Sequence, residues 1–297
     1  MPATTSSLDQ AYAVCLRVAR RHYENFPVAS WLLPTRMRPH IAAVYAFARY
    51  ADDLADEGVH CPGDRHAALD AWMTRLHLAL DRTQDTFEDT PDEDAVCRAL
   101  AATIRDRELP VSLFEDLISA FRQDVTVHRY VGWDELLDYC RRSANPVGRL
   151  VLRIAGYRDA ELDRASDDVC SALQLTNFLQ DFEVDWLRGR LYIPSDIFRE
   201  HGATEQQLRA PQLSKAWRTA VAETAVRTRG MFENGRALCD TVGGRLGLEL
   251  RLTWLGGRRI LDRLEMNGYD PRARRPTLGW SEALPLAWKT ATWRQRP

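Results

Sequence analysis

The sequence predicts an all-α protein with one domain over residues 1–297. Apolar residues recur at helical spacing along almost the whole chain, and most glycines and prolines fall between the resulting segments. The contents of 45% hydrophobic and 28% charged residues are those of an ordinary globular protein. No repeat, low-complexity tract or long linker divides the chain, so its length should build one substantial core.

Each expected helix covers a stretch in which apolar residues return every three or four positions. These stretches are residues 7–22, 36–57, 64–82, 92–107, 110–123, 133–156, 159–187, 211–239, 245–266 and 276–292. Pro146 falls inside one of them, where its ring should kink the helix rather than end it. The only convincing extended piece is Leu191-Tyr192-Ile193.

Composition and termini exclude several classes of protein. The net charge of −2 gives no global sign of nucleic-acid binding. The six cysteines contain no CxxC pair, which argues against zinc and redox motifs and suits a reducing compartment. The first ten residues lack the basic and apolar regions of a secretory signal, and no apolar run is long enough to span a bilayer. A cytoplasmic protein is expected, and tryptophans near its C-terminus hint at peripheral membrane contact: Trp280, Trp288 and Trp293.

An acidic cluster ends one of the most apolar helices. Residues 41–48 are apolar on all sides, which is typical of a buried helix. Five polar residues then share one helical face at spacings of i, i+4, i+7, i+8 and i+11: Tyr45, Arg49, Asp52, Asp53 and Asp56. Carboxylates on such a helix are costly to bury unless a cation binds them, so they are expected to line an interior cavity.

A second polar stripe repeats this geometry more than a hundred residues later. Its members step by three, four and four residues along an otherwise apolar helix: Gln174, Asn177, Asp181 and Asp185. Glu183 points away from this stripe and should be solvated. A single acidic run is explained equally well as a solvated helix end, but two stripes on apolar helices favour a metal site.

The expected metal is Mg²⁺, with several ions carrying a diphosphate. Mg²⁺ is a hard ion that combines one or two carboxylates with substrate phosphates. The candidate ligands are the oxygen-bearing side chains of the two stripes, with Asp53 either a ligand or a support for one: Asp52, Asp53, Asp56, Asn177, Asp181 and Asp185. Without metal, facing stripes would repel each other.

At these residues the chain resembles the squalene/phytoene synthase family over nearly its whole length. The matching motifs, in order, are His22-Tyr23-Glu24-Asn25-Phe26-Pro27, Leu32-Leu33-Pro34, Tyr45-Ala46-Phe47-Ala48-Arg49, Asp52-Asp53-x-x-Asp56, Tyr139-Cys140, Pro146-Val147-Gly148, Gln174-Leu175-Thr176-Asn177, Asp181-x-x-x-Asp185 and Arg190-Leu191-Tyr192. The resemblance implies the isoprenoid synthase fold, in which helices surround a central active-site cavity. It also implies an enzyme that eliminates diphosphate from a prenyl substrate.

Within the family, the chain looks most like the hopanoid-pathway branch called hydroxysqualene synthase. The hints are the segments HYENFPVAS, SANPVGRLVL and DWLRGRLYIP. This resemblance implies Mg²⁺-dependent ionisation of presqualene diphosphate, rearrangement of the cation and capture of water, giving hydroxysqualene. It further implies coupling to a relative that makes presqualene diphosphate and to a flavoprotein that reduces hydroxysqualene. NADPH is not expected, and no GxGxxG motif follows a strand.

Three departures from the general family pattern bear on substrate choice. Asn25 replaces a common serine, and Asn145-Pro146 replaces a small Ala-Gly pair. Gln180 stands where many relatives carry arginine before the second aspartate motif. Losing a phosphate-facing arginine suits an enzyme that handles one diphosphate rather than two.

The resemblance also assigns roles to individual residues. The expected catalytic residues are Tyr45, Arg49, Asp52, Asp56, Asn177, Asp181 and Asp185. The expected substrate-binding residues are His22, Asn25, Phe26, Arg49, Tyr139, Gln174, Asn177, Arg190, Tyr192, Tyr269 and Arg274. Aromatic faces stabilise cations, although for any one ring ordinary core packing is the better explanation; the candidates are Phe26, Tyr45, Phe47, Tyr139 and Phe178. The sequence does not choose which side chain orients the water among His22, Tyr139 and Asn145.

Two other functions stay open at this point. A relative on the same scaffold could condense farnesyl or geranylgeranyl diphosphate to squalene, dehydrosqualene or phytoene. A helical assembly protein without catalysis could keep the fold, although it would be expected to lose some aspartates, and this chain has kept them.

Overall fold

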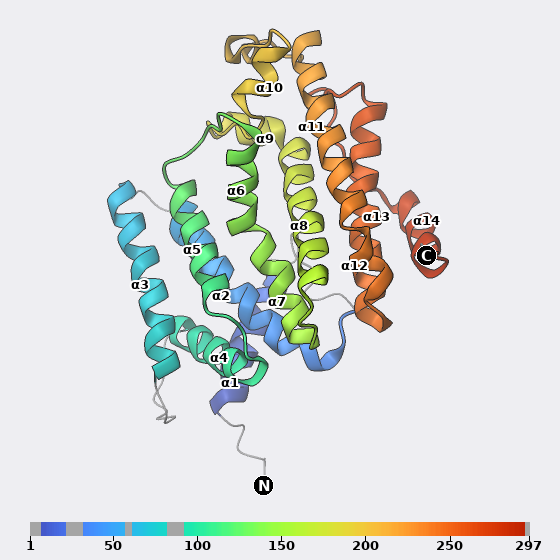
Figure 1. The fold of residues 1–297 in the computed structure, drawn as a ribbon. Helices are drawn as coiled ribbons and strands as arrows, with labels where there is room; N and C mark the ends of the chain where they lie inside the picture. The colour runs from blue at the N-terminus through green and yellow to red at the C-terminus, as the bar shows by residue number, and fades with distance from the viewer. Residues whose placement is uncertain (1–6, 22–31, 57–60, 82–91, 295–297) are drawn as a thin grey trace. The chain divides into compact units, whose positions relative to one another are not determined.

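The computed structural model describes residues 7–21, 32–56, 61–81 and 92–294, apart from the side chain of Trp280. Within these ranges the chain is helical and forms no strand, which confirms the predicted all-α class (Figure 1). The extended piece around Leu191 makes only an isolated parallel bridge to Arg129. The chain forms two compact units, residues 1–126 with 149–158 and residues 127–148 with 159–297. Each unit is built around one central helix.

The first unit is organised by α2 (Arg38–Asp56), which follows a short 3₁₀ turn, η2 (Thr35–Met37). Helix α2 packs against the other helices of this unit: α1 (Ser7–Arg21), α3 (Pro62–Asp81), α4 (Asp92–Arg107) and α5 (Ser112–Asp124). Its residues 41–44 are all buried, as are Ala46 and Phe47, which confirms that the apolar stretch of this helix is mostly buried. The alanines let neighbouring helices approach closely, while Phe47 stacks on Trp72. The aspartates are therefore carried on a helix that packs against four others of the unit.

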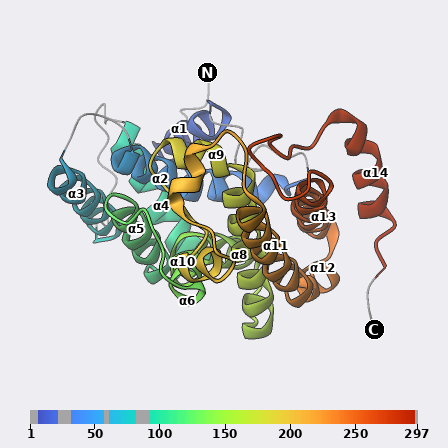
Figure 2. The same ribbon diagram turned by 90° about the horizontal axis from the view of Figure 1, so that it is seen from above.

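The second unit is organised by α8 (Ala160–Gln180), which packs against α6 (Trp133–Ser143), α11 (Lys215–Asn234), α12 (Arg236–Thr241) and α13 (Gly244–Met266). Figure 2 shows α8, α11 and α13 side by side, with α14 (Trp280–Ala291) lying against α13. The Asp159 carboxylate caps the start of α8 by accepting hydrogen bonds from the backbone amides of Glu161 and Leu162 at 2.7 and 3.0 Å. This unit also contains α9 (Phe182–Leu187), α10 (Ser195–Glu200) and η3 (Glu205–Arg209).

Three of the predicted helices are each divided in two. The helix expected over 159–187 breaks at Asp181, and the one over 211–239 breaks at Gly235. The prediction that Pro146 only kinks its helix was wrong, because α6 ends at Ser143 and α7 (Asn145–Ala155) starts afresh. Proline is tolerated in the first turn of a helix, where its missing N–H has no partner to lose. No described helix is both long and apolar enough to cross a membrane.

Two adjacent glycines of α13 give a test of this packing. A Cβ on Gly257 would lie 2.5 Å from Cζ of buried Phe232 and 2.9 Å from a methyl group of Leu173. A Cβ on Gly256 would meet only Leu278, at an ordinary 3.5 Å. We expect Gly257→Ala to lower the free energy of unfolding by about 1–3 kcal/mol through overpacking. Gly256→Ala should leave it unchanged or raise it by up to about 1 kcal/mol, because alanine favours helix. Equal effects of the two substitutions in urea denaturation would contradict the packing of α13 on α8 and α11.

Candidate active site

The first aspartate cluster is held by an arginine on its own helix. Arg49 Nη1 lies 2.9 Å from Asp52 Oδ2, and its other terminal nitrogen pairs with Asp53 Oδ1. These partners are three and four residues away, the separations that bring side chains together on one helical face. The side chains of Asp52 and Asp53 are 43% and 33% exposed, and Asp56 is exposed. The acidic face of α2 is thus partly open to solvent, and Arg49 offsets part of its negative charge.

Two residues near the aspartates interact with their negative charge. The pKa of Tyr45 is shifted by burial and by this charge, and Arg65 adds a positive charge at the end of α2. Burial raises the pKa of the Tyr45 hydroxyl; nearby Arg49 lowers this pKa, while Asp52 and Asp53 raise it. At the end of α2, Arg65 Nη1 donates a 2.8 Å hydrogen bond to the carbonyl of Ala55. A guanidinium there opposes the negative end of the helix dipole, which would otherwise add to the aspartates. This role was not predictable from the sequence, because Arg65 belongs to the following helix.

The second stripe survives the break between α8 and α9. The amide of Asp181 donates to the Asn177 carbonyl at 2.8 Å, and the amide of Asp185 donates to the Asp181 carbonyl at 2.9 Å. Because both bonds keep helical register, Asn177, Asp181 and Asp185 stay one turn apart. Gln174 is half-buried one turn earlier, whereas Asn177 is exposed. The stripe is therefore a real surface feature of the second unit.

A C-terminal segment, which we call the strap (residues 267–279), is tied to this stripe. Arg275 donates two hydrogen-bond-length contacts to Asp181 Oδ1, from Nε at 2.7 Å and from Nη2 at 2.6 Å. Directly before Asp181, Gln180 Nε2 donates to the Pro276 carbonyl at 2.7 Å. Gln180 is thus hydrogen-bonded to the backbone of the strap, and Arg275 forms the ion pair with Asp181.

Two buried ionic residues fix the rest of the strap. The Asp270 side chain accepts hydrogen bonds from the amides of Arg272 and Ala273 at 3.2 and 3.1 Å. Arg272 pairs with Glu183 of α9 and donates to the carbonyls of Leu208 and Ala210, both at 2.8 Å. Glu183, expected to be solvated, is 36% exposed and also pairs with Arg272, whose side chain is 8% exposed.

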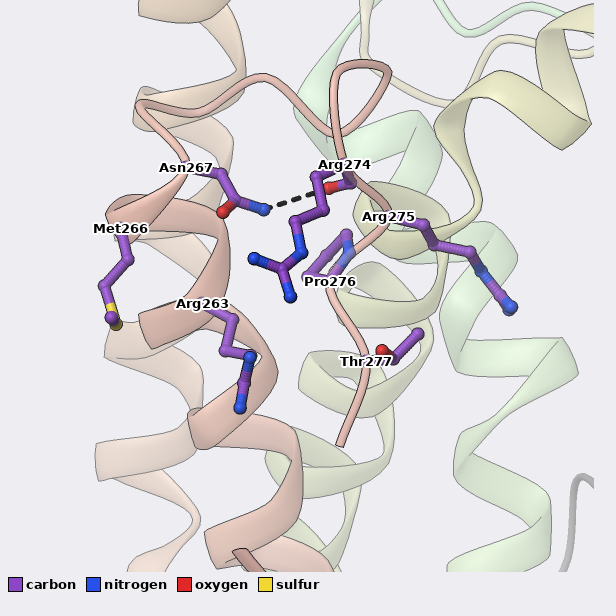
Figure 3. Close-up of a pocket in the computed structure, with 7 residues that line it drawn as sticks. All are labelled: Arg263, Met266, Asn267, Arg274, Arg275, Pro276 and Thr277. Atoms are coloured by element: carbon purple, nitrogen blue, oxygen red, sulfur yellow. Dashed lines mark hydrogen bonds between the residues drawn. The ribbon is translucent and has the colours of Figure 1, made fainter. Parts of the chain in front are cut away.

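A small pocket lies beside the strap and is shown in Figure 3. Its volume is about 190 Å³, and its lining is Arg263, Met266, Asn267, Arg274, Arg275, Pro276 and Thr277. Arg274 extends into the space near Arg263, whereas Arg275 points away from it, consistent with its pairing to Asp181.

Tyr269, the other predicted strap residue, has a left-handed backbone at φ 56°. Burial and the neighbouring Glu265 raise the pKa of the Tyr269 hydroxyl. Substrate binding by Tyr269 and Arg274 stays a prediction.

An aromatic cluster lies next to the stripe within the second unit. Phe178, one residue after Asn177, stacks on Tyr192 with ring centres 3.6 Å apart and planes 4° from parallel. Tyr139 and Tyr130 lie against the same Tyr192 ring at 6.3 and 5.9 Å. The structure thus brings together three residues that the sequence singled out from separate segments, and adds Tyr130. Phe178, Tyr139 and Tyr130 are buried, and the faces of such rings carry the negative charge of the quadrupole that attracts a cation.

The remaining predicted residues have varied surroundings. The backbone amide of Arg190 donates to the Asp185 carbonyl at 2.8 Å, which places this residue beside the stripe. Phe47 is fully buried against Trp72 and Phe114, which favours plain core packing for this ring. Asn145 is buried, and its side-chain oxygen accepts a 2.8 Å hydrogen bond from Ser171. The predictions for His22, Asn25 and Phe26 lie outside the described residues.

The donor chemistry of both stripes fits Mg²⁺. Carboxylate and amide oxygens are hard ligands, and Arg49 and Arg275 show that the carboxylates at both places accept a cation. Over the described ranges, no group of three or more His, Cys, Asp or Glu side chains is arranged to hold a metal ion. Which of these oxygens hold metal stays a prediction.

Sequence comparison identifies the family. The sequence profile described as squalene/phytoene synthase matches residues 19–282, so the chain belongs to this family of enzymes that process prenyl diphosphates. The hydroxysqualene synthase of Zymomonas mobilis is 36% identical over 277 residues, covering 91% of this chain and 88% of the relative. The phytoene synthase of Thermus thermophilus is 33% identical and covers 100% and 98% of the two chains.

Solved structures agree with the fold. The crystal structure of squalene synthase HpnC from Alicyclobacillus acidocaldarius is 42% identical, with a TM-score of 0.80 over 88% of this chain and 95% of that one. A dehydrosqualene synthase also reaches a TM-score of 0.80, over 96% and 97% of the two chains. Its identity is 21%, so this second likeness shows the fold alone.

Adjacent arginines of the strap test how it is held. We expect Arg272→Ala to lower the free energy of unfolding by about 2–4 kcal/mol, because it leaves Glu183 and two carbonyls without their donor. Arg274→Ala should change it by less than about 0.5 kcal/mol, since that side chain is exposed. Denaturation by urea measures both. A loss for Arg274→Ala as large as that for Arg272→Ala would contradict the assigned contacts.

Proposed function

We propose that this chain is a hydroxysqualene synthase: it ionises presqualene diphosphate with Mg²⁺, lets the cation rearrange and captures water. The observation that carries the proposal is the side chain of Gln180. It is neutral and bonded to the Pro276 carbonyl, so it offers no cation to a second diphosphate. Relatives named hydroxysqualene synthase, 36–37% identical over 88–91% of the chain, support the same choice.

The acidic stripes would hold the metal in this proposal. Asp52 and Asp56 on α2, and Asn177, Asp181 and Asp185 on α8 and α9, would bind Mg²⁺, with Asp53 as a further ligand or support. When bound, Mg²⁺ supplies Lewis-acid stabilisation of the departing diphosphate. Arg49 and Arg275 already lie on carboxylates of the two stripes and would donate hydrogen bonds to phosphate oxygens as metal takes over those carboxylates. Arg190, Arg274 and Tyr269 are further candidates for phosphate contact.

The chemistry then needs a surface for the cation and a controlled water. As the carbon–oxygen bond breaks, diphosphate leaves with the electron pair and a carbocation remains. The stacked rings of Phe178 and Tyr192, with Tyr139, would stabilise it by about 0.5–2 kcal/mol per ring. Water adds its oxygen to the cation and loses a proton, which the released diphosphate can accept. No hydride enters this balance, so NADPH is not required.

The reaction implies neighbours in metabolism. A separate family member would supply presqualene diphosphate by condensing farnesyl diphosphate, and a flavoprotein would reduce hydroxysqualene. The enzyme would then act in the cytoplasm, taking presqualene diphosphate from the first partner and supplying hydroxysqualene to the second.

The second candidate is a condensing enzyme that makes squalene, dehydrosqualene or phytoene from farnesyl or geranylgeranyl diphosphate. The observations in its favour are the 33% identity to a phytoene synthase over the full chain and the 42% identity to a structure titled squalene synthase. A non-catalytic assembly protein is disfavoured because the chain keeps both aspartate motifs of the family, Asp52-Asp53-x-x-Asp56 and Asp181-x-x-x-Asp185.

Product analysis by gas chromatography–mass spectrometry tests the proposal. Purified protein with Mg²⁺ receives presqualene diphosphate or farnesyl diphosphate, each with and without NADPH. We expect hydroxysqualene from presqualene diphosphate alone, in amounts that NADPH does not change. Presqualene diphosphate, squalene or a dehydro product from farnesyl diphosphate would contradict the proposal and favour the condensing enzyme.

The same assay includes one pair of variants, at Asp181, which caps the C-terminus of α8, and at Glu161 in the first turn of α8. We expect Asp181→Asn to lower turnover at least about 100-fold, because it removes a charge from the metal-binding stripe, with the melting temperature unchanged. Glu161→Gln is the matched control, since its side chain is 88% exposed in the first turn of the same helix. Near-normal turnover by Asp181→Asn would contradict the role of the second stripe.

A further inference from the structure

The C-terminal helix α14 buries two polar side chains and leaves two large apolar side chains exposed. Its inward positions, four residues apart, are Glu282, Leu286 and Thr290, all at most 9% exposed. On the outward side, Leu284 is 83% exposed and Trp288 is 71% exposed. A surface helix ordinarily turns such apolar residues toward the core. The exposed Leu–Trp pair, which we call the α14 outer face, therefore calls for an explanation.

Helix α14 is firmly held at both ends, so its outer face is not a frayed tail. At its start, Glu282 accepts from Arg259 Nε at 2.5 Å and pairs with Arg263 Nη2 at 2.9 Å. The hydrogen bond from Arg263 lowers the Glu282 pKa to about 2, so the carboxylate stays charged at neutral pH.

After the helix, Trp293 donates to Asp240 at 2.7 Å and packs edge-on against Trp254, with Arg236 over its ring at 4.2 Å. Of the two described C-terminal tryptophans, Trp293 is thus a structural anchor, and Trp288 is the one left outside. The fold orients Leu284 and Trp288 outward rather than leaving them unplaced.

The charged residues of α14 and of the described residues after it are two exposed cations and one buried acid. Within residues 280–294 these are Lys289, Arg294 and Glu282. That acid is buried and neutralised by two arginines, whereas Lys289 and Arg294 are exposed. The surface offered by α14 therefore combines leucine, tryptophan and cations without an exposed carboxylate.

We propose that the α14 outer face docks on the surface of an anionic lipid bilayer. Tryptophan and leucine beside lysine and arginine are the composition of helices that lie in the membrane interface. A stable protein–protein interface needs about 800 Å² from each partner, more than two large apolar side chains on one short helix provide. The inference rests on the proposed function in one respect: a bilayer is where a substrate and product with long prenyl tails would be found.

Vesicle flotation of the full-length protein, without substrate or Mg²⁺, tests this proposal apart from the proposed reaction. We expect the wild type to float with phosphatidylcholine vesicles that contain phosphatidylglycerol, and more weakly with phosphatidylcholine alone. Leu284→Ser combined with Trp288→Ser should weaken binding at least about tenfold. Lys289→Glu combined with Arg294→Glu should weaken binding to anionic vesicles by roughly fivefold per charge and leave binding to neutral ones unchanged.

Val226→Ser is the matched control, because Val226 is 62% exposed on α11 of the same unit. It should float like the wild type, and unchanged melting temperatures confirm that each variant is folded. The proposal is overturned if the wild type does not float, if the Leu284/Trp288 variant floats equally well, or if Val226→Ser loses as much. Sedimentation velocity without vesicles adds a further arm. Self-association that the Leu284/Trp288 variant abolishes would overturn the proposal by assigning this face to a second copy of the chain.

Discussion

Pairing of carboxylates with arginine is the interaction on which the candidate site depends. Negative charges stacked along one helical face repel one another, and they persist only where a cation offsets them. Arg49 does this for Asp52 and Asp53, and Arg275 does it for Asp181. The two arginines differ in origin: one lies on the same helix as its partners, and the other comes from a segment more than ninety residues away. In the proposed function, each arginine gives up its carboxylate partner to a metal ion.

The strap holds Arg275 beside Asp181, because other contacts already fix its backbone. Buried Asp270 and Arg272 fix the segment through backbone and side-chain contacts, and Gln180 holds its far side. These contacts order the backbone of the strap, so placing Arg275 on Asp181 costs little further backbone entropy. An exposed arginine on a fixed backbone can leave its carboxylate for a phosphate without the strap unfolding. In this account, charge exchange is local and the helices act as a rigid support.

Much of the site was predictable because helical spacing is a strong signal. The steps from Tyr45 to Asp56 and from Asn177 to Asp185 placed each stripe on one face, and the buried residues of α2 followed from its apolar sequence. The break at Asp181 was not predictable, since the backbone hydrogen bonds on either side keep helical register and the sequence pattern does not change.

Contacts made by irregular segments were beyond the reach of sequence reasoning. Glu183 and Arg272 are 89 residues apart, and nothing local indicates that they pair. Arg274 and Arg275 are neighbours on a strap without periodicity, so the choice between them depends on the turn that only the structure shows. The burial of Glu282 on α14 likewise depends on Arg259 and Arg263 of another helix.

The central claim is that the stripes bind diphosphate only together with Mg²⁺, and ligand-induced thermal stabilisation tests it most directly. A ligand that binds only the native state raises the melting temperature. With Mg²⁺ and inorganic diphosphate at millimolar concentration, the account predicts an increase of several degrees that exceeds the sum of the increases caused by each alone. No increase with both present, or the same increase with diphosphate and no metal, would contradict it.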